Sequence, residues 1–197
     1  MKYRLKYQSR AFGLYIGLAT VLGVGLIVLL VMGPRWLATV PQAEIATVAT
    51  APAAEARKIR ARLFYVDEQG TGLTGVEREV LYGEGTIEQA KRIVEAQIAA
   101  PPEPLASAIP PGTALRRVFF TKAGDMYVDL SPELRQNHPG GTTNEILTVY
   151  AIVSVLTTNL PAVTGVQILI DGKEVDTLAG HLDLRRPIER DPKWITN

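Results

Sequence analysis

The sequence predicts an α+β fold: a two-layer sandwich of a mostly antiparallel sheet with two main helices, preceded by one N-terminal transmembrane helix. Three observations support this prediction. An uncharged apolar run lies near the N-terminus. After residue 56, several short segments alternate apolar and polar side chains, as half-buried strands do. Two longer segments carry apolar side chains at helical spacing. Because these segments follow the order ββα-ββα-ββ, we expect the helices on one face of the sheet.

Composition excludes several classes of protein. The chain has 197 residues, of which 47% are hydrophobic and 21% charged, and this balance suits a folded domain. A net charge of +1 without any clustered basic block argues against a nucleic-acid partner. The absence of cysteine excludes disulfides, zinc–thiolate sites and thiol nucleophiles. It also excludes a lipoprotein anchor, which needs a cysteine to carry the lipid.

The apolar run predicts a membrane anchor. Residues 13–33 contain no charged side chain and are long enough to cross about 30 Å of hydrocarbon as a helix. Residues 1–12 carry four of the flanking basic side chains, whereas Arg35 alone follows closely. The positive-inside rule therefore predicts a cytoplasmic N-terminus and an extracytoplasmic C-terminal domain. A cleaved signal peptide is the competing interpretation, but its apolar region would be shorter, about 7–15 residues.

Residues 34–56 predict a linker, because they are rich in Ala, Thr and Pro and show no sustained period. The first strand follows in "RKIRARLFYVD", where Ile59, Ala61, Leu63 and Tyr65 share one face. "GTGLTG" has turn composition, and "VEREVLYG" alternates again. These two strands are expected to form a hairpin.

The first helix is predicted after Thr86, which can serve as its N-cap, with Gln89 at the capping-box position. Pro101 and Pro102 end it. Its apolar stripe is expected to consist of Ile87, Ala90, Val94 and Ile98.

Two further strands are predicted near residues 115–121 and 126–130, joined by a "KAGD" turn. The second helix begins with Thr142 or Thr143 as its cap and Glu145 just inside, and Pro161 stops it. Its apolar surface is so broad that most of the helix must be covered. A last hairpin turns at Asp171–Gly172, a dipeptide suited to a type I′ turn.

The stretch "YVDLSPELRQNHPGG" contains Asp129, Ser131 and His138, the residue types of a hydrolase triad. A nucleophile also needs a base within hydrogen-bond reach and a group that orients it, which sequence proximity does not provide. "SPEL" is typical of a helix start with serine as N-cap, and Asp129 is expected to close the strand on its exposed edge. "PGG" after His138 would hold a base poorly. We therefore predict a strand end and a helix start, without catalytic residues.

The other histidine, His181, lies near Asp183 in "GHLDLRRPIER". A metal site usually needs three or four protein ligands, and no such spacing is present. These two side chains are expected to tie the C-terminal segment to the domain by hydrogen bonds. "GEGTIEQ" lacks the P-loop lysine, so no phosphate-binding loop is predicted. No catalytic, cofactor-binding or metal-binding residue is therefore assigned, and no cofactor is expected.

Several segments together resemble the GerMN domain, known from sporulation and spore-germination proteins. The similarity covers residues 57–190 and leaves 191–197 as a C-terminal tail; its segments are "IPPGTALRRVFF", "GDMYVDLS", "HPGGTTNEILTVYAIVSVLTTNLPAVTGVQILIDG" and "TLAGHLDLRRPI". The resemblance implies an extracytoplasmic, envelope-associated domain that assists assembly or localisation, with no established enzymatic activity. It provides no catalytic residues. Unlike the family's lipoproteins, this chain has no cysteine to lipidate.

The functional expectation is a binding or scaffold module of the bacterial cell envelope, not an enzyme. It would sit in the inner (cytoplasmic) membrane by a single N-terminal helix, with its domain in the periplasm. Its expected partners are the membrane, envelope proteins or peptidoglycan, and a second copy of the chain, but no nucleic acid. The alternative is a peptidoglycan-remodelling enzyme that uses acidic residues brought together by folding.

Overall fold

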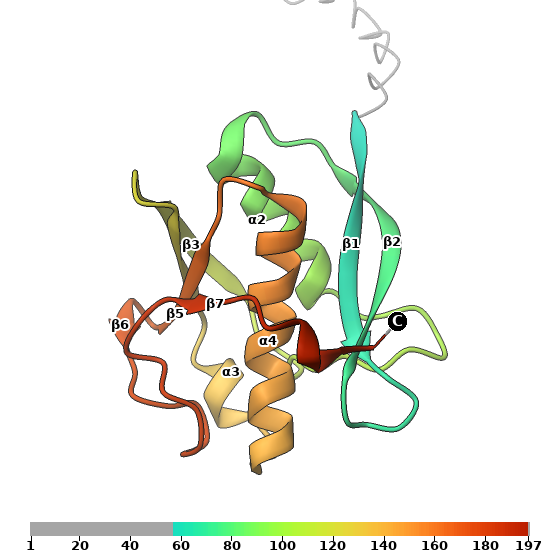
Figure 1. Cartoon of the computed structure of the whole chain (residues 1–197), viewed down its shortest axis with the longest axis vertical. Helices are drawn as coiled ribbons and strands as arrows, with labels where there is room; N and C mark the ends of the chain where they lie inside the picture. The colour runs from blue at the N-terminus through green and yellow to red at the C-terminus, as the bar shows by residue number, and fades with distance from the viewer. Residues whose placement is uncertain (1–56, 197) are drawn as a thin grey trace, which may run out of the picture. The chain divides into compact units, whose positions relative to one another are not determined.

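The structure, a computed structural model, describes residues 57–196 and has an α+β fold, as predicted (Figure 1). The predicted transmembrane segment, 13–33, and the linker, 34–56, lie outside the described residues. Between residues 57 and 196, no helix has the length and apolar character that a membrane span requires.

The strands form two separate sheets, where one mostly antiparallel sheet was predicted. The first has the order β1-β2-β8. Its hairpin β1–β2 matches the predicted pair, and β8 joins β2 in parallel. The strands are β1 (Lys58–Val66), β2 (Leu73–Leu81) and β8 (Ile195–Thr196).

The second sheet has the order β3-β4-β5-β6, and β7 also pairs with β5. Pairing between β4 and β5 is parallel because helix α4 carries the chain back across the sheet between them. The pairings β1–β2, β3–β4, β5–β6 and β5–β7 are antiparallel, so the predicted mostly antiparallel character is confirmed, although the strands are divided between two sheets. The strands are β3 (Leu115–Phe120), β4 (Asp125–Leu130), β5 (Gly165–Ile170), β6 (Lys173–Glu174) and β7 (Ile188–Glu189).

Two main helices, α2 (Gly85–Ile98) and α4 (Thr142–Asn159), lie between the sheets. Figure 1 shows α4 running alongside β1, with the β3–β5 strands on its other side. The short helix α3 (Glu133–Gln136) follows β4, and a 3-10 turn, η1 (Pro192–Trp194), precedes β8. Because α4 contacts strands of both sheets as well as α2, ten of its residues are buried. The prediction that this helix is largely covered is confirmed.

The face predicted for β1 is confirmed for Ala61, Leu63 and Tyr65, which are buried in the core, but Phe64, on the opposite face, is buried as well. The predicted stripe of α2 was wrong at Ile87, whose side chain is 40% exposed. The buried face of α2 is rotated toward Ile93 and includes the amide side chains of Gln89 and Gln97. The turn at Asp171–Gly172 was predicted correctly, because both residues have the positive φ that a type I′ turn requires.

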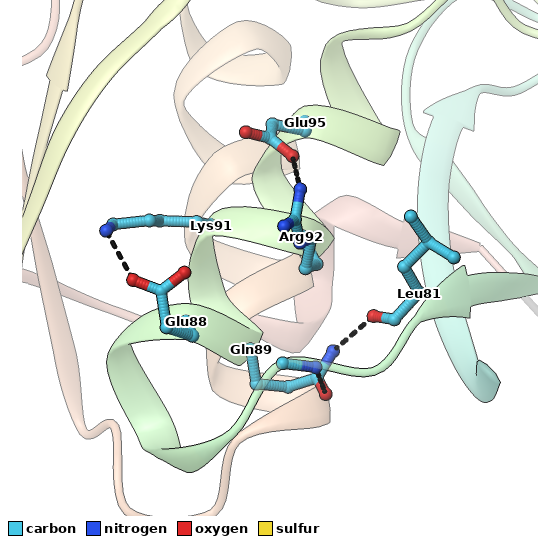
Figure 2. Close-up of polar contacts among 7 residues, drawn as sticks. Leu81, Glu88, Gln89, Lys91, Arg92 and Glu95 are labelled. Atoms are coloured by element: carbon cyan, nitrogen blue, oxygen red, sulfur yellow. Dashed lines mark hydrogen bonds and ion pairs between the residues drawn. The ribbon is translucent and has the colours of Figure 1, made fainter. Parts of the chain in front are cut away.

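The predicted helix caps differ from the observed ones. Helix α2 starts at Gly85, and no side chain caps it. Gln89 nevertheless reaches back in front of the helix, as its capping-box position suggested: its Oε1 accepts from the Gly83 N–H at 2.9 Å and its Nε2 donates to the Leu81 carbonyl at 3.3 Å (Figure 2). Helix α4 starts at Thr142 with Gly141 before it, so neither threonine is the N-cap.

Figure 2 also shows two ion pairs on the solvent face of α2, Glu88–Lys91 at 2.5 Å and Arg92–Glu95 at 3.2 Å. All four side chains are at least one-third exposed, so these pairs contribute little to stability.

Candidate functional site

The three triad candidates do not form a site, because each makes hydrogen bonds to other groups. Ser131 is buried, and its Oγ accepts from the Ala114 backbone N–H at 2.9 Å. This bond ties the end of β4 to the residue before β3. Helix α3 does start here, as "SPEL" predicted, but Pro132 precedes its first residue and no side chain caps it. Ser131 is therefore not the cap that the sequence predicted.

Asp129 is 1% exposed, so its predicted place on an exposed edge was wrong. Its Oδ1 accepts from the Gly172 N–H at 2.7 Å, and its Oδ2 accepts from Arg116 Nε at 3.3 Å. A second guanidinium nitrogen of Arg116 pairs with Asp171 at 2.9 Å. The carboxylate thus fixes the β5–β6 turn from the neighbouring strand, which is a structural task.

His138 is held at both ring nitrogens, although the following "PGG" predicted a loosely held side chain. Nδ1 accepts from the Gly140 N–H at 3.0 Å, and Nε2 lies 3.3 Å from Thr148 Oγ1. Thr148 in turn donates to the Ala108 carbonyl at 2.6 Å. This pattern fits the tautomer with its proton on Nε2. The imidazole joins the loop before α4 to the helix and has neither Ser131 nor Asp129 as a hydrogen-bond partner.

The sequence prediction missed the most strongly bound carboxylate, Glu145. Its side chain is fully buried in the first turn of α4. Oε1 accepts from the backbone N–H groups of Leu178 at 2.8 Å and Ala179 at 2.9 Å, and Oε2 accepts from that of His181 at 2.8 Å. Burial opposes the charged form, but these backbone donors outweigh it and lower the pKa of Glu145. A charged residue inside a broadly apolar helix was the available signal.

Glu145 therefore ties the C-terminal segment to the domain, the role that was predicted for the side chains of His181 and Asp183. The backbone of His181, not its side chain, makes the bond to the domain, and the ring is exposed. Asp183 bonds within its own loop to Arg185, with an Oδ2–Nη2 distance of 2.7 Å. This ion pair lowers the pKa of Asp183. Both side chains are more than half exposed, so the pair contributes little to stability.

Neither a metal centre nor an enclosed active site is apparent in the described part of the chain. Its His, Asp and Glu side chains form no group of three or more that could hold a metal ion. Val66 lines two open hollows. The smaller, about 350 Å³, is lined by Pro110, Pro111, Pro139 and neighbouring residues. The larger, about 650 Å³, includes Asp67, Glu68, Val76 and Leu105 in its lining.

The fold is similar to that of solved GerMN domains. The first GerMN domain of the sporulation protein GerM from Bacillus subtilis matches with a TM-score of 0.51 and 18% identity, over 67% of this chain and 98% of that one. The tandem GerMN domains of the same protein match with a TM-score of 0.51 and 18% identity, over 68% of this chain and 46% of that one. At this identity the likeness concerns the fold alone.

A Clostridium perfringens protein described as a candidate lipoprotein matches with a TM-score of 0.48 and 24% identity, over 68% of this chain and 89% of that one. No curated protein matches the chain. The family model described as "Germane: Sporulation and spore germination" matches residues 62–176, from the middle of β1 to the residue pair after β6. Since this match covers more than half of the chain and its fold is that of the GerMN domains, the chain belongs to the Germane family.

Proposed function

We propose that this protein is a membrane-anchored, extracytoplasmic binding or scaffold module of the bacterial cell envelope. One observation supports this most directly: the polar side chains that could suggest catalysis are bound to the backbone of the domain itself. Asp129 and Glu145 hold turns and loops, Ser131 joins two strands, and His138 joins a loop to a helix. Groups used in this way are poorly placed to react with a substrate.

The proposed location rests on the apolar segment 13–33 and on the basic residues that precede it. The domain then works on the far side of the inner membrane, tethered by the linker 34–56. Its proposed partners are envelope proteins or peptidoglycan, together with a second copy of the chain. A role in assembling or localising cell-wall machinery agrees with membership of a family described by sporulation and spore germination.

Three measurements test this proposal. A reporter fused after Asn197 that is active only outside the cytoplasm is expected to be active, and a matched cytoplasmic reporter inactive; the reverse result would overturn the topology. Crosslinking in intact membranes is expected to capture an envelope protein with the full chain. Purified full-length protein in detergent is expected to release no soluble fragments from peptidoglycan. Fragment release that Asp129→Asn abolishes in a folded protein would favour the enzyme instead.

A further inference from the structure

The two outer edges of the β1–β2–β8 sheet differ in how they are closed. On the β1 side, side-chain amides occupy the backbone groups that a further strand would use. Asn159 accepts from the Arg62 N–H at 2.9 Å and donates to the Arg62 carbonyl at 2.9 Å. Gln97 does the same at Phe64, with distances of 2.8 and 2.6 Å. The Val66 N–H donates to the Ala106 carbonyl at 2.9 Å. These bonds close the β1 edge from Arg62 to Val66 to a further strand.

The β2 side is open along its middle. Strand β8 covers only Leu73 and Thr74, and Gln89 binds the Leu81 carbonyl at the other end. Glu77 lies opposite Arg62 in the register, and Gly75 lies opposite Phe64. Since Arg62 and Phe64 direct their backbone groups away from β2, antiparallel geometry directs those of their partners away from β1.

The outward backbone groups of β2 therefore belong to Gly75, Glu77 and Glu79. In the parallel pairing of Thr74 with Thr196 the Gly75 N–H faces β8, whereas among residues 57–196 no strand or side chain is bonded to the outward backbone groups of Glu77 and Glu79. Proteins usually protect such edges, and this one protects its opposite edge with the side-chain amides of Gln97 and Asn159. The open segment is thus bounded at both ends and has room for a short strand.

Side-chain charge indicates what kind of strand fits. Glu77 and Glu79 are both exposed on the outer face of β2. Glu79 pairs with Lys58 at 2.9 Å, whereas Glu77 has no ion pair among the described residues. In a symmetric antiparallel pairing of two β2 edges, Glu77 would face Glu77 or Glu79 of the other copy, and like charges directly opposite destabilise a pairing. A strand with basic side chains is favoured in its place.

The opposite face of the edge adds a second observation. The hollow of about 650 Å³ reaches this strand, because Thr74 and Val76 of β2 and Thr196 of β8 line it. Its other lining residues combine apolar Leu105 with acidic Asp67 and Glu68. Side chains of an added strand alternate between the two faces. One set would therefore meet Glu77 and Glu79, and the other set would enter this hollow.

We propose that the β2 edge from Gly75 to Glu79 binds an extended segment of a partner protein by strand addition, and that this segment carries Lys or Arg side chains at alternate positions. Main-chain hydrogen bonds supply affinity in this mode, and the side-chain sites supply specificity. The inference rests on the proposed function, since it states how a binding module holds its partner. The partner's basic side chains lie beside Glu77 and Glu79, and an intervening side chain occupies the hollow beside Val76.

The test uses the full chain in detergent and a blocked, fluorescently labelled peptide, Lys-Thr-Lys-Val-Lys-Thr. Fluorescence anisotropy is expected to detect binding, and hydrogen exchange is expected to show protection of Glu77 and Glu79 amides. The matched peptide with Glu in place of Lys is expected to bind at least tenfold more weakly. The double variant Glu77→Lys/Glu79→Lys should weaken binding of the Lys peptide at least tenfold, whereas Glu174→Lys, an exposed acid on β6, should leave it unchanged.

A backbone variant separates strand addition from simple charge attraction. Glu77→Pro removes an outward N–H without removing a bond to β1, so it should reduce binding at least tenfold while urea unfolding shows a folded domain. Three outcomes would overturn the inference. The first is that the Lys peptide does not bind at all, the second is that it binds the Glu77→Lys/Glu79→Lys and Glu77→Pro variants as tightly as the original chain, and the third is that it protects only the amides of another strand. The reporter fusion after Asn197 tests the membrane topology independently of peptide binding. Membrane crosslinks that persist in the edge variants would reject this inference and leave the proposed function standing.

Discussion

The side-chain amide of Gln97 binds both backbone groups of Phe64, accepting from its N–H at 2.8 Å and donating to its carbonyl at 2.6 Å. The amide takes the place of a neighbouring strand. Both residues are fully buried, so no water can replace these bonds without opening the core. Asn159 makes the same pair of bonds at Arg62, from the last residue of α4. Two helices are thereby attached to the edge of one strand.

Gln97→Leu tests this attachment. The substitution keeps the volume but leaves the N–H and the carbonyl of Phe64 buried without partners. Each unsatisfied group costs about 1–3 kcal/mol, so we expect the free energy of unfolding to fall by about 2–4 kcal/mol. Urea denaturation followed by circular dichroism measures it. Gln136→Leu, at an exposed position on α3, is the control and should change stability by less than about 0.5 kcal/mol. Equal effects of the two substitutions would contradict the attachment.

Glu145→Gln tests the carboxylate that holds the 178–181 loop. The amide NH₂ would face a backbone donor, and the charge-assisted bonds would be lost, so we expect a loss of about 2–4 kcal/mol at pH 7. Glu174→Gln, an exposed acid, is the control and should have little effect. Hydrogen exchange should show faster exchange of the Leu178, Ala179 and His181 amides in the Glu145 variant alone. Unchanged exchange would contradict the assigned bonds.

Comparing the original chain with Glu145→Gln also tests how the stabilisation by Glu145 depends on pH. Backbone donors lower the pKa of folded Glu145 below the ordinary value of 4.5 despite its burial. A lowered pKa means that the folded state binds the proton less readily than the unfolded state. The stabilisation is therefore fully present above pH 4.5 and is lost as the pH falls through the lower, folded value. The stability difference between the original chain and Glu145→Gln should shrink over that acidic range. A difference that stays constant would contradict the lowered pKa.

Local sequence patterns correctly predicted those features that depend on residues close together in the chain, such as strand faces and turns. Alternation placed Leu63 and Tyr65 in the core, and the Asp171–Gly172 dipeptide predicted its turn. The split into two sheets could not be predicted in this way, because β2 and β3, which precede and follow α2 in the chain, belong to different sheets. The predicted stripe of α2 was right at Ala90 and Val94 but left out the buried amide of Gln97. Gln97 belongs to the buried face because its partner, Phe64, lies 33 positions earlier in the chain.

The candidate residues illustrate the same limit. Ser131, Asp129 and His138 are close in sequence, and that proximity suggested a triad. Ser131 and Asp129, however, bind Ala114 and Gly172 in other segments, and His138 contacts Thr148 of α4 as well as the nearby Gly140. Asp129 also has two charge partners, Arg116 and Arg117, whose Nε atoms lie 3.3 and 3.9 Å from its Oδ2. The residue types predicted that these side chains would make structural hydrogen bonds, but not which groups they would bind.

Gly83→Ala tests the close approach between the end of the first hairpin and α2. A Cβ atom at Gly83 would lie 2.4 Å from the Glu88 carbonyl carbon and 2.6 Å from the Gln89 nitrogen. These are helix backbone atoms and cannot rotate away, so we expect a loss of about 2–3 kcal/mol in thermal or urea unfolding. Gly75→Ala is the matched control, because its Cβ would meet the flexible Arg62 side chain. The Gly75 variant should lose less than about 1 kcal/mol; a larger loss there than at Gly83 would contradict this reasoning.

Ser131→Ala separates the structural role of this hydroxyl from a catalytic one. The Ala114 N–H would lose its acceptor at a partly buried position, so we expect a loss of about 0.5–1.5 kcal/mol. The reason differs from the lost helix cap that the sequence suggested, so exchange of the Ala114 amide, and not fraying of α3, should report the change. Partner crosslinking in membranes should remain at the level of the original chain. Ser107→Ala, whose Oγ bonds within its own loop, is the control for a hydroxyl loss elsewhere. A well-folded Ser131→Ala protein that loses all function would restore the nucleophile interpretation.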